Sequence, residues 1–238
     1  MKYKLEKSNY DNLKTVKMTC DEPLTKKREI KEPFLNSSSF FYLLCAPAGS
    51  GKSTLMMQML QTKQLYYRLF KDIIYVCPPN SRSTVKDNPL CDLETVYDGL
   101  SSDIFDKIEE NNDEYKKLDK KNYKQLLIID DCSSSLKDHE NLKMLSKLVM
   151  NRRHYSLSII ILVQYLYSVP KPIRSNINAL IVFKPLMQDL EILRKEFINM
   201  KKDDFYELCR FVFQNKHDNL FINISNNTLY KNLQKIIL

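Results

Sequence analysis

Nine consecutive residues, 46–54, contain the residue types that bind a nucleoside triphosphate. Gly49 and Gly51 let the backbone curl so that successive N–H groups point inward, and a following helix adds its positive N-terminal end to that anion-binding nest. Lys52 is placed to reach the β- and γ-phosphates, and the Ser53 hydroxyl is the expected protein ligand of the nucleotide's Mg²⁺. The segment therefore predicts a site for ATP or GTP. The predicted nucleotide-binding residues are Ala46, Pro47, Ala48, Gly49, Ser50, Gly51, Lys52, Ser53 and Thr54.

The segment departs from the usual motif at one position, and its neighbours provide the expected context. The motif as usually written begins with Gly, where this chain has Ala46. Because the Ala side chain is minimal, we expect a functional loop with slightly altered turn geometry. An apolar run at residues 40–45 precedes the loop and a helix-like segment, 53–60, follows it, as the motif requires. The alternative is a Gly/Ser-rich turn before an amphipathic helix.

Two later apolar runs end in polar side chains. Residues 126–129 lead into Asp130 and Asp131, and residues 157–163 lead into Gln164. Ligands of α/β sheets bind beyond the carboxyl ends of the strands, so we predict that Asp130 binds Mg²⁺, usually through water. Asp131 would polarise the water that attacks the γ-phosphate, and Gln164 would sense that phosphate or orient the water. The alternatives are that Asp131 only caps a turn and that Gln164 only marks the exit of its strand into solvent.

Arginine side chains are a further requirement, because they stabilise the charge of a transition state. The candidates are Arg152, Arg153 and Arg174. The pair Arg152-Arg153 could equally finish a helix, where cations suit the helix dipole. The catalytic residues that we predict are Lys52, Asp131, Gln164, Arg153 and Arg174.

Strand-like and helix-like segments alternate along the chain and would position these residues. The apolar runs suggest strands at 40–45, 72–77, 125–129, 157–163 and 179–183, with helices near 53–60, 101–118, 138–153, 186–199 and 202–213. Continuous apolarity favours parallel strands buried on both faces. We therefore predict an α/β fold with a mostly parallel sheet covered by helices on both faces.

The expected organisation is a single domain with short additions. Residues 1–36 form an N-terminal arm or lead-in strand, residues 37–215 the core, and residues 216–238 a C-terminal hairpin or tail. The polar stretch 80–124 is the part least readily placed. With 238 residues, 3 Gly and 9 Pro, the chain can bury a sizeable core and contains no flexible linker between two domains.

Composition narrows the class of protein. No apolar run approaches the roughly 20 residues of a membrane span, and the polar N-terminus is not that of a signal peptide, so we predict an intracellular protein. The six cysteines are scattered, which favours buried reduced thiols at Cys45, Cys77 and Cys132 over a zinc site or a redox role. A net charge of +8 favours polyanionic partners, although many lysines alternate with acidic residues, as on solvated helix faces.

Taken in order, these elements resemble the FtsK/HerA superfamily of P-loop ATPases and, within it, the poxvirus-type virion DNA-packaging ATPases of large DNA viruses and virophages. The resemblance covers about residues 35–185. It rests on the phosphate-binding loop, the strand that ends in Asp130 and Asp131, the stretch 151–164 with its Arg-His and strand-Gln elements, and residues 172–176.

The resemblance implies a RecA-like P-loop NTPase that uses ATP and Mg²⁺, assembles as a homo-oligomeric ring and drives double-stranded DNA into a capsid. Capsid vertex proteins would be further partners, and the host cytoplasm or the virion would be its location. Asp131 stands where the family places its catalytic acidic residue, commonly Glu, and Gln164 matches the family's polar sensor. Either Arg153 or Arg174 would act as a finger on a neighbouring subunit.

Two other functions stay open at this point. A helicase or partition-type ATPase of the same broad fold would separate strands or form filaments. A nucleotide-gated virion protein would bind ATP without useful turnover. The use of ATP over GTP also stays open.

Overall fold

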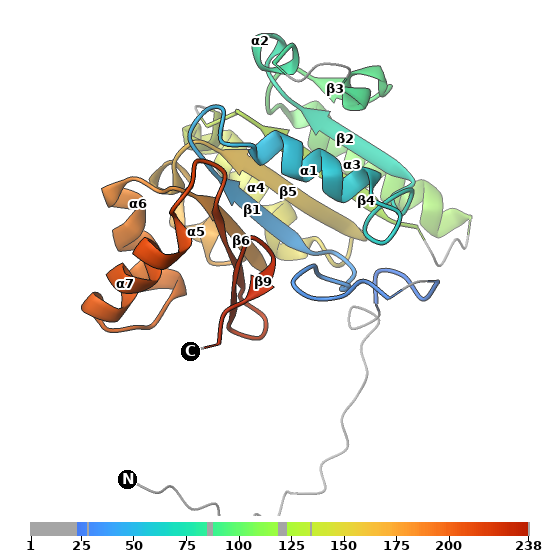
Figure 1. The fold of residues 1–238 in the computed structure, drawn as a ribbon. Coiled ribbons are helices and arrows are strands. Elements are labelled where there is room, and N and C mark those ends of the chain that lie inside the picture. Colours follow the sequence, from blue (N-terminus) through green and yellow to red (C-terminus); the bar gives the residue numbers. More distant parts are fainter. Residues whose placement is uncertain (1–22, 28, 85–87, 119–122, 134, 238) are drawn as a thin grey trace, which may run out of the picture.

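The computed structural model describes residues 23–27, 29–84, 88–118, 123–133 and 135–237. Cys20 and most of the expected N-terminal arm lie outside these residues. Within them, one nine-stranded sheet has the order β3-β2-β4-β5-β1-β6-β7-β8-β9. Figure 1 shows this sheet crossing the molecule. Its strands are β1 (Phe41–Cys45), β2 (Asp72–Val76), β3 (Val96–Tyr97), β4 (Gln125–Asp130), β5 (Leu157–Val163), β6 (Ala179–Phe183), β7 (Asn219–Asn223), β8 (Thr228–Lys231) and β9 (Gln234–Lys235).

The sheet is parallel from β3 to β6 and antiparallel from β6 to β9. Its central strands are in a register that makes their carboxyl ends level, since Cys45 pairs with Val163 and Asp130 with Leu162. The residues that follow β1, β4 and β5 therefore emerge at one edge. This is the edge at which open α/β sheets bind ligands.

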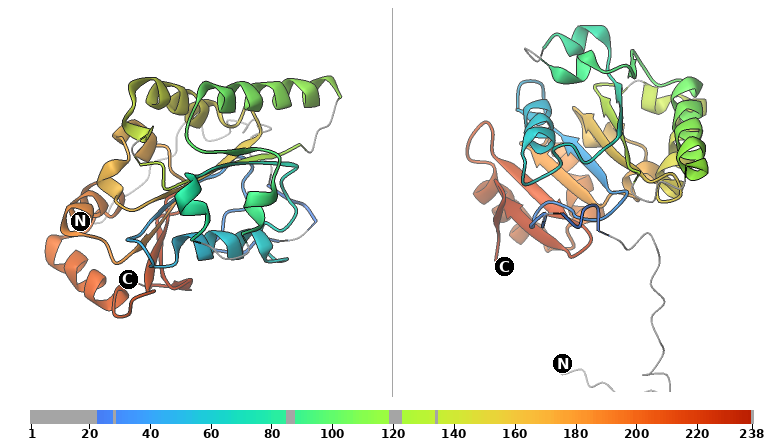
Figure 2. Two further views of the ribbon diagram at one scale, coloured as in Figure 1. Left: turned by 90° about the horizontal axis from the view of Figure 1, so that it is seen from above. Right: turned by 90° about the vertical axis from the view of Figure 1, so that its right-hand side faces the viewer.

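Helices cover both faces of the sheet, as predicted. Figure 2 shows α3 and α4 on one side and α1 on the other. The helices are α1 (Lys52–Gln61), α2 (Pro79–Arg82), α3 (Ser102–Lys117), α4 (His139–Asn151), α5 (Lys171–Arg174), α6 (Met187–Ile192) and α7 (Lys202–Val212), with 3₁₀ turns η2 (Pro89–Asp92), η3 (Ser135–Lys137) and η4 (Leu166–Ser168) and a π-helical turn η5 (Leu193–Phe197). None of the helices that the structure describes is long and apolar enough to cross a membrane.

Alternation along β1 produces the two apolar layers. Phe41, Leu43 and Cys45 pack with the core under α3, α4 and α7, whereas Tyr42 and Leu44 pack with the core under α1. All five side chains are buried, so this central strand has no solvent-facing side. The continuous apolar runs of the sequence thus have the physical cause expected of them, and the predicted α/β fold class is confirmed.

Several details differ from the expectation or extend it. The helix expected at 186–199 is α6 followed by the π-helical turn η5. The stretch 80–124 contains α3 and the short strand β3, which adds an edge to the sheet beside β2. Strands β7 and β8 form an antiparallel hairpin that pairs with β6 and so shares the sheet with the central strands. The division into arm, core and C-terminal segment stays a prediction.

Candidate functional site

The loop between β1 and α1 has the backbone of an anion nest. Gly49 and Gly51 have φ angles of 72° and 101°, in the left-handed region that glycine adopts without strain. Gly51 is the N-cap of α1, and no side chain caps this helix. The N–H groups of its first turn therefore face the loop opening and are available to an anion. At the base of the loop, Ala46 is fully buried and its N–H donates to the Val163 carbonyl.

The predicted residues that follow three different strands meet around one cavity of about 230 Å³. Loop residues approach it from β1, carboxylates from β4 and an amide from β5. Ala46, Pro47, Ser50, Arg153 and Arg174 are not among its lining residues. The lining consists of Ala48, Gly49, Gly51, Lys52, Ser53, Thr54, Ser81, Thr84, Asp130, Asp131 and Gln164.

Asp130 and Ser53 form the part of the cavity that fits a magnesium ion. The Ser53 hydroxyl donates to Oδ2 of Asp130 over 3.0 Å. Burial raises the pKa of Asp130, an effect that Lys52 and the Ser53 hydrogen bond oppose and Asp131 reinforces. A nearby cation would favour the carboxylate form that burial disfavours. Mg²⁺ binds hard oxygen ligands and usually takes one or two carboxylates together with substrate phosphates, so this donor set suits it.

Asp131 faces a different set of neighbours, although it adjoins Asp130. Its φ of 57° is in the left-handed region and turns the chain out of the strand. Its carboxylate accepts a hydrogen bond from Gln164 Nε2 over 2.9 Å and one from the Ser81 hydroxyl over 2.7 Å. The half-buried Gln164 amide thus points at a carboxylate of the cavity. This arrangement fits a carboxylate that is held in place to polarise water.

Sequence reasoning missed Ser81 and Thr84, which also line the cavity. Ser81 lies on α2, which begins directly after β2 with Pro79 at its first position, as proline allows. Strand β2 is parallel to β4 and adjacent to it, so its carboxyl end reaches the same edge. The apolar run at 72–77 predicts the strand that precedes Ser81. The order of the strands in the sheet is needed to place the residues after that strand at the site.

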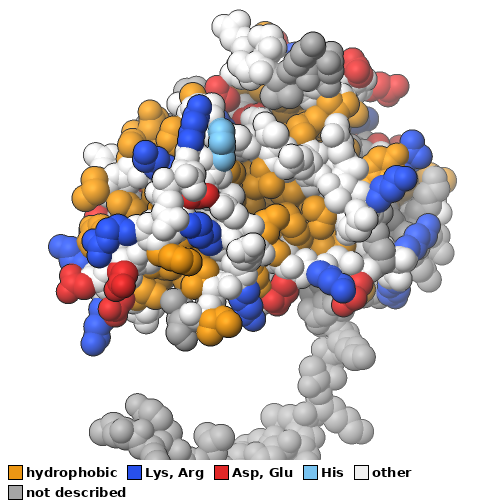
Figure 3. All heavy atoms as spheres, viewed as in Figure 1, with side chains coloured by type: hydrophobic (Ala, Val, Ile, Leu, Met, Phe, Trp, Pro, Cys, Tyr) orange, Lys and Arg blue, Asp and Glu red, His pale blue; other side chains and the backbone are white. Residues whose placement is uncertain are grey.

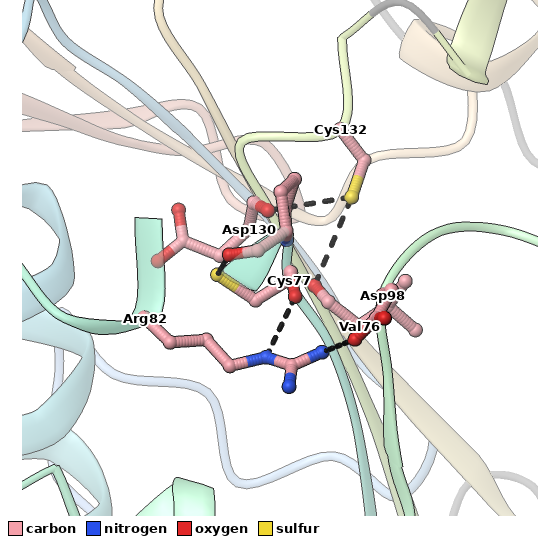
Figure 4. A network of polar contacts seen from close by, with 7 residues as sticks. Val76, Cys77, Arg82, Asp98, Asp130 and Cys132 are labelled. Carbon is pink, nitrogen blue, oxygen red and sulfur yellow. Dashed lines mark hydrogen bonds and ion pairs between the residues drawn. The ribbon is translucent and has the colours of Figure 1, made fainter. Parts of the chain in front are cut away.

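Arg82 holds α2 in place beside the cavity. Its Nε donates to the Cys77 carbonyl over 2.8 Å, and its guanidinium pairs with Asp98. Figure 4 shows this side chain extended past Cys77 toward Asp98, with Asp130 and Cys132 above it. The contacts join α2 to the end of β2 and to the segment after β3. The hydroxyl of Ser81 is therefore carried by an anchored helix.

The cysteines around the site are protonated thiols in a closed environment. Cys45, Cys77 and Cys132 are buried and not disulfide-bonded, as expected. Burial raises the pKa of Cys77 to about 11 and that of Cys132 to about 12. Since the thiolate is the reactive form, these side chains are inert packing groups at neutral pH.

The three arginines proposed from the sequence do not line the cavity. Arg174 is buried and its guanidinium donates to both carboxylate oxygens of Glu196, over 2.9 and 2.6 Å, and to the Val169 carbonyl. Arg152 is also buried and donates to the Ser39 and Val149 carbonyls. Arg153 is exposed. A role as a finger on a second subunit stays a prediction for Arg153 and Arg174, and Arg174 would have to leave Glu196 to perform it.

Comparison with known proteins gives one family and several relatives. Residues 27–238 match the family model described as Poxvirus A32 protein. A protein of Frog virus 3 (isolate Goorha), described as Uncharacterized protein 015R, is 26% identical over 137 residues, which are 57% of this chain and 41% of that protein. The chain thus spans about two fifths of the length of that relative.

Solved structures share the fold at low sequence identity. The genome packaging NTPase B204 from Sulfolobus turreted icosahedral virus 2, in complex with AMPPCP, has a TM-score of 0.57 and 18% identity, covering 84% of this chain and 98% of that one. EssC (ATPases 2 and 3) from Geobacillus thermodenitrificans has a TM-score of 0.56 and 13% identity, covering 83% of this chain and 39% of that one. Both have the fold predicted from the alternation of strands and helices.

Proposed function

Because the chain belongs to the Poxvirus A32 protein family, we propose that it hydrolyses ATP and uses that reaction to package double-stranded viral DNA into a capsid. The family membership agrees with the resemblance drawn from the sequence. One observation carries the proposal. Phosphate-loop residues and the side chains at the ends of β4 and β5 line a single cavity, in which the Ser53 hydroxyl donates to Asp130 and the Ser81 hydroxyl donates to Asp131.

Binding of the nucleotide is the first step that these residues support. The uncapped start of α1 and the curled loop present N–H groups to the phosphates, and Lys52 adds a full positive charge. Ser53 and Asp130 would hold Mg²⁺, which when bound neutralises charge on the β- and γ-phosphates. The solved structure of B204 with AMPPCP supports this part of the proposal, since that protein binds a nucleotide analogue on the same fold.

Hydrolysis needs a water molecule placed in line with the γ-phosphate. Asp131 is the carboxylate for that water, because it borders the cavity and two donors fix its orientation. Gln164 donates to Asp131 and lines the same cavity, so it can respond to the presence of the γ-phosphate. Little covalent chemistry is required of the protein in phosphoryl transfer, and positioned charge accounts for most of the rate.

DNA is the proposed cargo and binds through its phosphates. A net charge of +8 favours a polyanion, and phosphate contacts allow grip without sequence preference. Figure 3 shows one face of the molecule, over which Lys and Arg side chains are scattered with acidic side chains among them. The proposal therefore rests DNA contact on the charge of the chain as a whole. A homo-oligomeric ring, contact with capsid vertex proteins and a location in the host cytoplasm or the virion belong to the same proposal.

The test is the rate of ATP hydrolysis by the assembled protein with and without double-stranded DNA. We expect DNA to raise the turnover of the wild type, and Lys52→Ala to abolish nucleotide binding under both conditions. Unchanged turnover on addition of DNA would contradict the packaging role. Strand separation in a separate strand-displacement assay would favour a helicase, and nucleotide binding without turnover would favour a nucleotide-gated virion protein.

A further inference from the structure

His217 contacts the phosphate loop from a distant part of the chain. Its Nδ1 lies 3.1 Å from the Ser50 carbonyl oxygen, although 167 positions separate the two residues. The same nitrogen would lie 3.7 Å from a Cβ built at Gly51, so the ring rests against the loop. A Cβ built at Gly49, in contrast, would have no atom beyond its chain neighbours within 4 Å. The loop is thus open at Gly49 and supported at Gly51.

The turn that carries His217 is held by a network of hydrogen bonds. The next residue, Asp218, is 5% exposed. Its Oδ2 accepts from the backbone N–H of Gln214 over 3.1 Å and from that of Asn215 over 2.7 Å, and its Oδ1 accepts from Asn232 Nδ2 over 2.6 Å. These bonds fix the turn between α7 and β7. His217 therefore lies on a turn whose backbone is held in place by hydrogen bonds.

Strands β7, β8 and β9, which form the antiparallel extension of the sheet, hold this turn to the rest of the molecule. The Lys231 ammonium donates to the Phe211 carbonyl over 2.8 Å and to the Gln214 side chain over 3.1 Å. Asn232, at the turn after β8, accepts from the Asn219 N–H over 2.8 Å. The end of α7, the turn and the β8–β9 hairpin are thus one connected structure, which ends in a contact with the phosphate loop.

Because the peptide unit is planar, the contact between His217 and the Ser50 carbonyl also determines the direction of the Gly51 N–H. A carbonyl oxygen can only accept, so Nδ1 of His217 must carry the hydrogen. The C=O and N–H of a trans peptide unit point in opposite directions in one plane. With the Ser50 C=O directed at His217, the N–H of Gly51 points away from the histidine. Gly51 lines the cavity, so the N–H that points away from His217 is left available to a phosphate bound there.

We propose that His217 is a positioning residue, which holds the phosphate loop in its nucleotide-binding conformation through the Ser50 carbonyl. This inference rests on the proposed function, because it assumes that the cavity binds a nucleoside triphosphate. It extends that function by giving the antiparallel extension a role in the site. His217 acts through the loop backbone and is assigned no part in the chemical step.

The experiment compares three histidine variants by nucleotide affinity and by steady-state hydrolysis. His217→Ala removes the donor. His217→Asn keeps an N–H donor near the position of Nδ1, and His154→Ala makes the same truncation at an exposed histidine after α4. The probes are a fluorescent ATP analogue with Mg²⁺ and the thermal midpoint of unfolding. Lys52→Ala serves as the reference for lost binding.

We expect His217→Ala to raise Kd and KM by about five- to tenfold, as for the loss of one hydrogen bond, with kcat within about twofold. His217→Asn should bind within about twofold of the wild type, and His154→Ala should be unchanged. Since His217 is exposed, its truncation should shift the thermal midpoint by no more than about 2 °C.

If the wild type binds nucleotide and His217→Ala binds equally well, the inference alone is overturned. Failure of His217→Asn to restore binding, or an equal loss in His154→Ala, would overturn it as well. If the wild type binds no better than Lys52→Ala, the proposed function falls and the inference falls with it. Nucleotide binding without stimulation by DNA would contradict the packaging role while the His217 comparison still decides the inference.

Discussion

Two adjacent carboxylates have separate surroundings because the backbone changes conformation between them. Asp130 is the last residue of β4, is 6% exposed and accepts a hydrogen bond from the Ser53 hydroxyl. Asp131 adopts a positive φ and receives its hydrogen bonds from Ser81 and Gln164. In the proposed mechanism, Asp130 would hold the metal ion and Asp131 would orient the water. The division of labour lies in the geometry, since the two side chains are chemically the same.

Ser81 provides a test of how Asp131 is held. Ser81→Ala removes one of the two donors to the carboxylate, so we expect kcat to fall about five- to tenfold with nucleotide Kd within about twofold. Ser83→Ala is the matched control, because the Ser83 hydroxyl is exposed and bonds to the Asn80 carbonyl. An equal effect of the two substitutions on kcat, or none from Ser81→Ala, would refute the role given to Ser81.

Gly51, one of the two loop glycines in the left-handed region, provides a second test at the scale of residues. Gly51→Ala places a Cβ on a residue with φ of 101°, a strain of about 1–2 kcal/mol, and we expect nucleotide affinity to fall about tenfold. Gly99→Ala is the control, since the nearest atom to its new Cβ would be the Ser135 hydroxyl at 4.0 Å. Isothermal titration with ATP compares the variants. Equal affinity of Gly51→Ala and the wild type would contradict the loop geometry.

At the scale of elements, short helices near the strand ends are fixed by arginine side chains, of which Arg174 is buried and Arg82 is half-buried. Arg82 fixes α2, and Arg174 joins α5 to η5 through Glu196. Both guanidinium groups also donate to backbone carbonyls, of Cys77 and Val169 respectively. These segments bring Ser81 to the site and support the strand ends around it. Arg174, which the sequence offers as a candidate for chemistry, therefore has a structural partner in Glu196.

The Arg174–Glu196 pair makes a pH-dependent contribution to stability. The hydrogen bond from Arg174 lowers the pKa of Glu196 below its ordinary value of 4.5. The contribution is therefore complete above about pH 4.5 and is lost as the pH falls through the lowered pKa. Glu196→Gln leaves a buried guanidinium without its counter-ion. We expect it to destabilise the fold at pH 7 by about 1–2 kcal/mol, less than at a fully buried pair because solvent screens the carboxylate.

Urea unfolding at pH 7 and at about pH 3.5 measures this effect. The difference between wild type and Glu196→Gln should shrink at the lower pH, because below about pH 4.5 the unfolded wild-type chain takes up a proton at Glu196 and the contribution of the pair begins to be lost. Glu191→Gln is the control, since its partners Arg194 and Lys195 form surface pairs, and it should change stability little at either pH. A difference that stays constant with pH would contradict the assignment.

At the scale of the whole molecule, local patterns predicted what is local. The phosphate loop, the strand that ends in two aspartates and the strand that ends in Gln164 were read from the sequence, because apolar runs and their polar ends are adjacent in the chain. The sequence did not predict Ser81 as a site residue, because its contact with Asp131 depends on the place of β2 beside β4 in the sheet. It did not predict His217 either, because the contact of His217 with Ser50 joins residues that are 167 positions apart.

Other limits of the sequence have equally physical causes. Strand β3 has two residues, too few for an apolar period, and is formed by pairing with β2. The π-helical turn after α6 interrupts a helix whose residues alone predict continuity. The partner of Arg174 lies 22 positions away, so its guanidinium could not be assigned to Glu196 before the fold was known.

Single-turnover hydrolysis of ATP by the wild type and Asp131→Asn, each saturated with nucleotide and Mg²⁺, tests the central claim most directly. The amide has the shape of the carboxylate without its charge, so we predict an unchanged Kd and a rate of hydrolysis lower by at least about a hundredfold. A rate for Asp131→Asn within a few-fold of the wild type would contradict the assignment of Asp131, and with it the account of this cavity as a site of ATP hydrolysis.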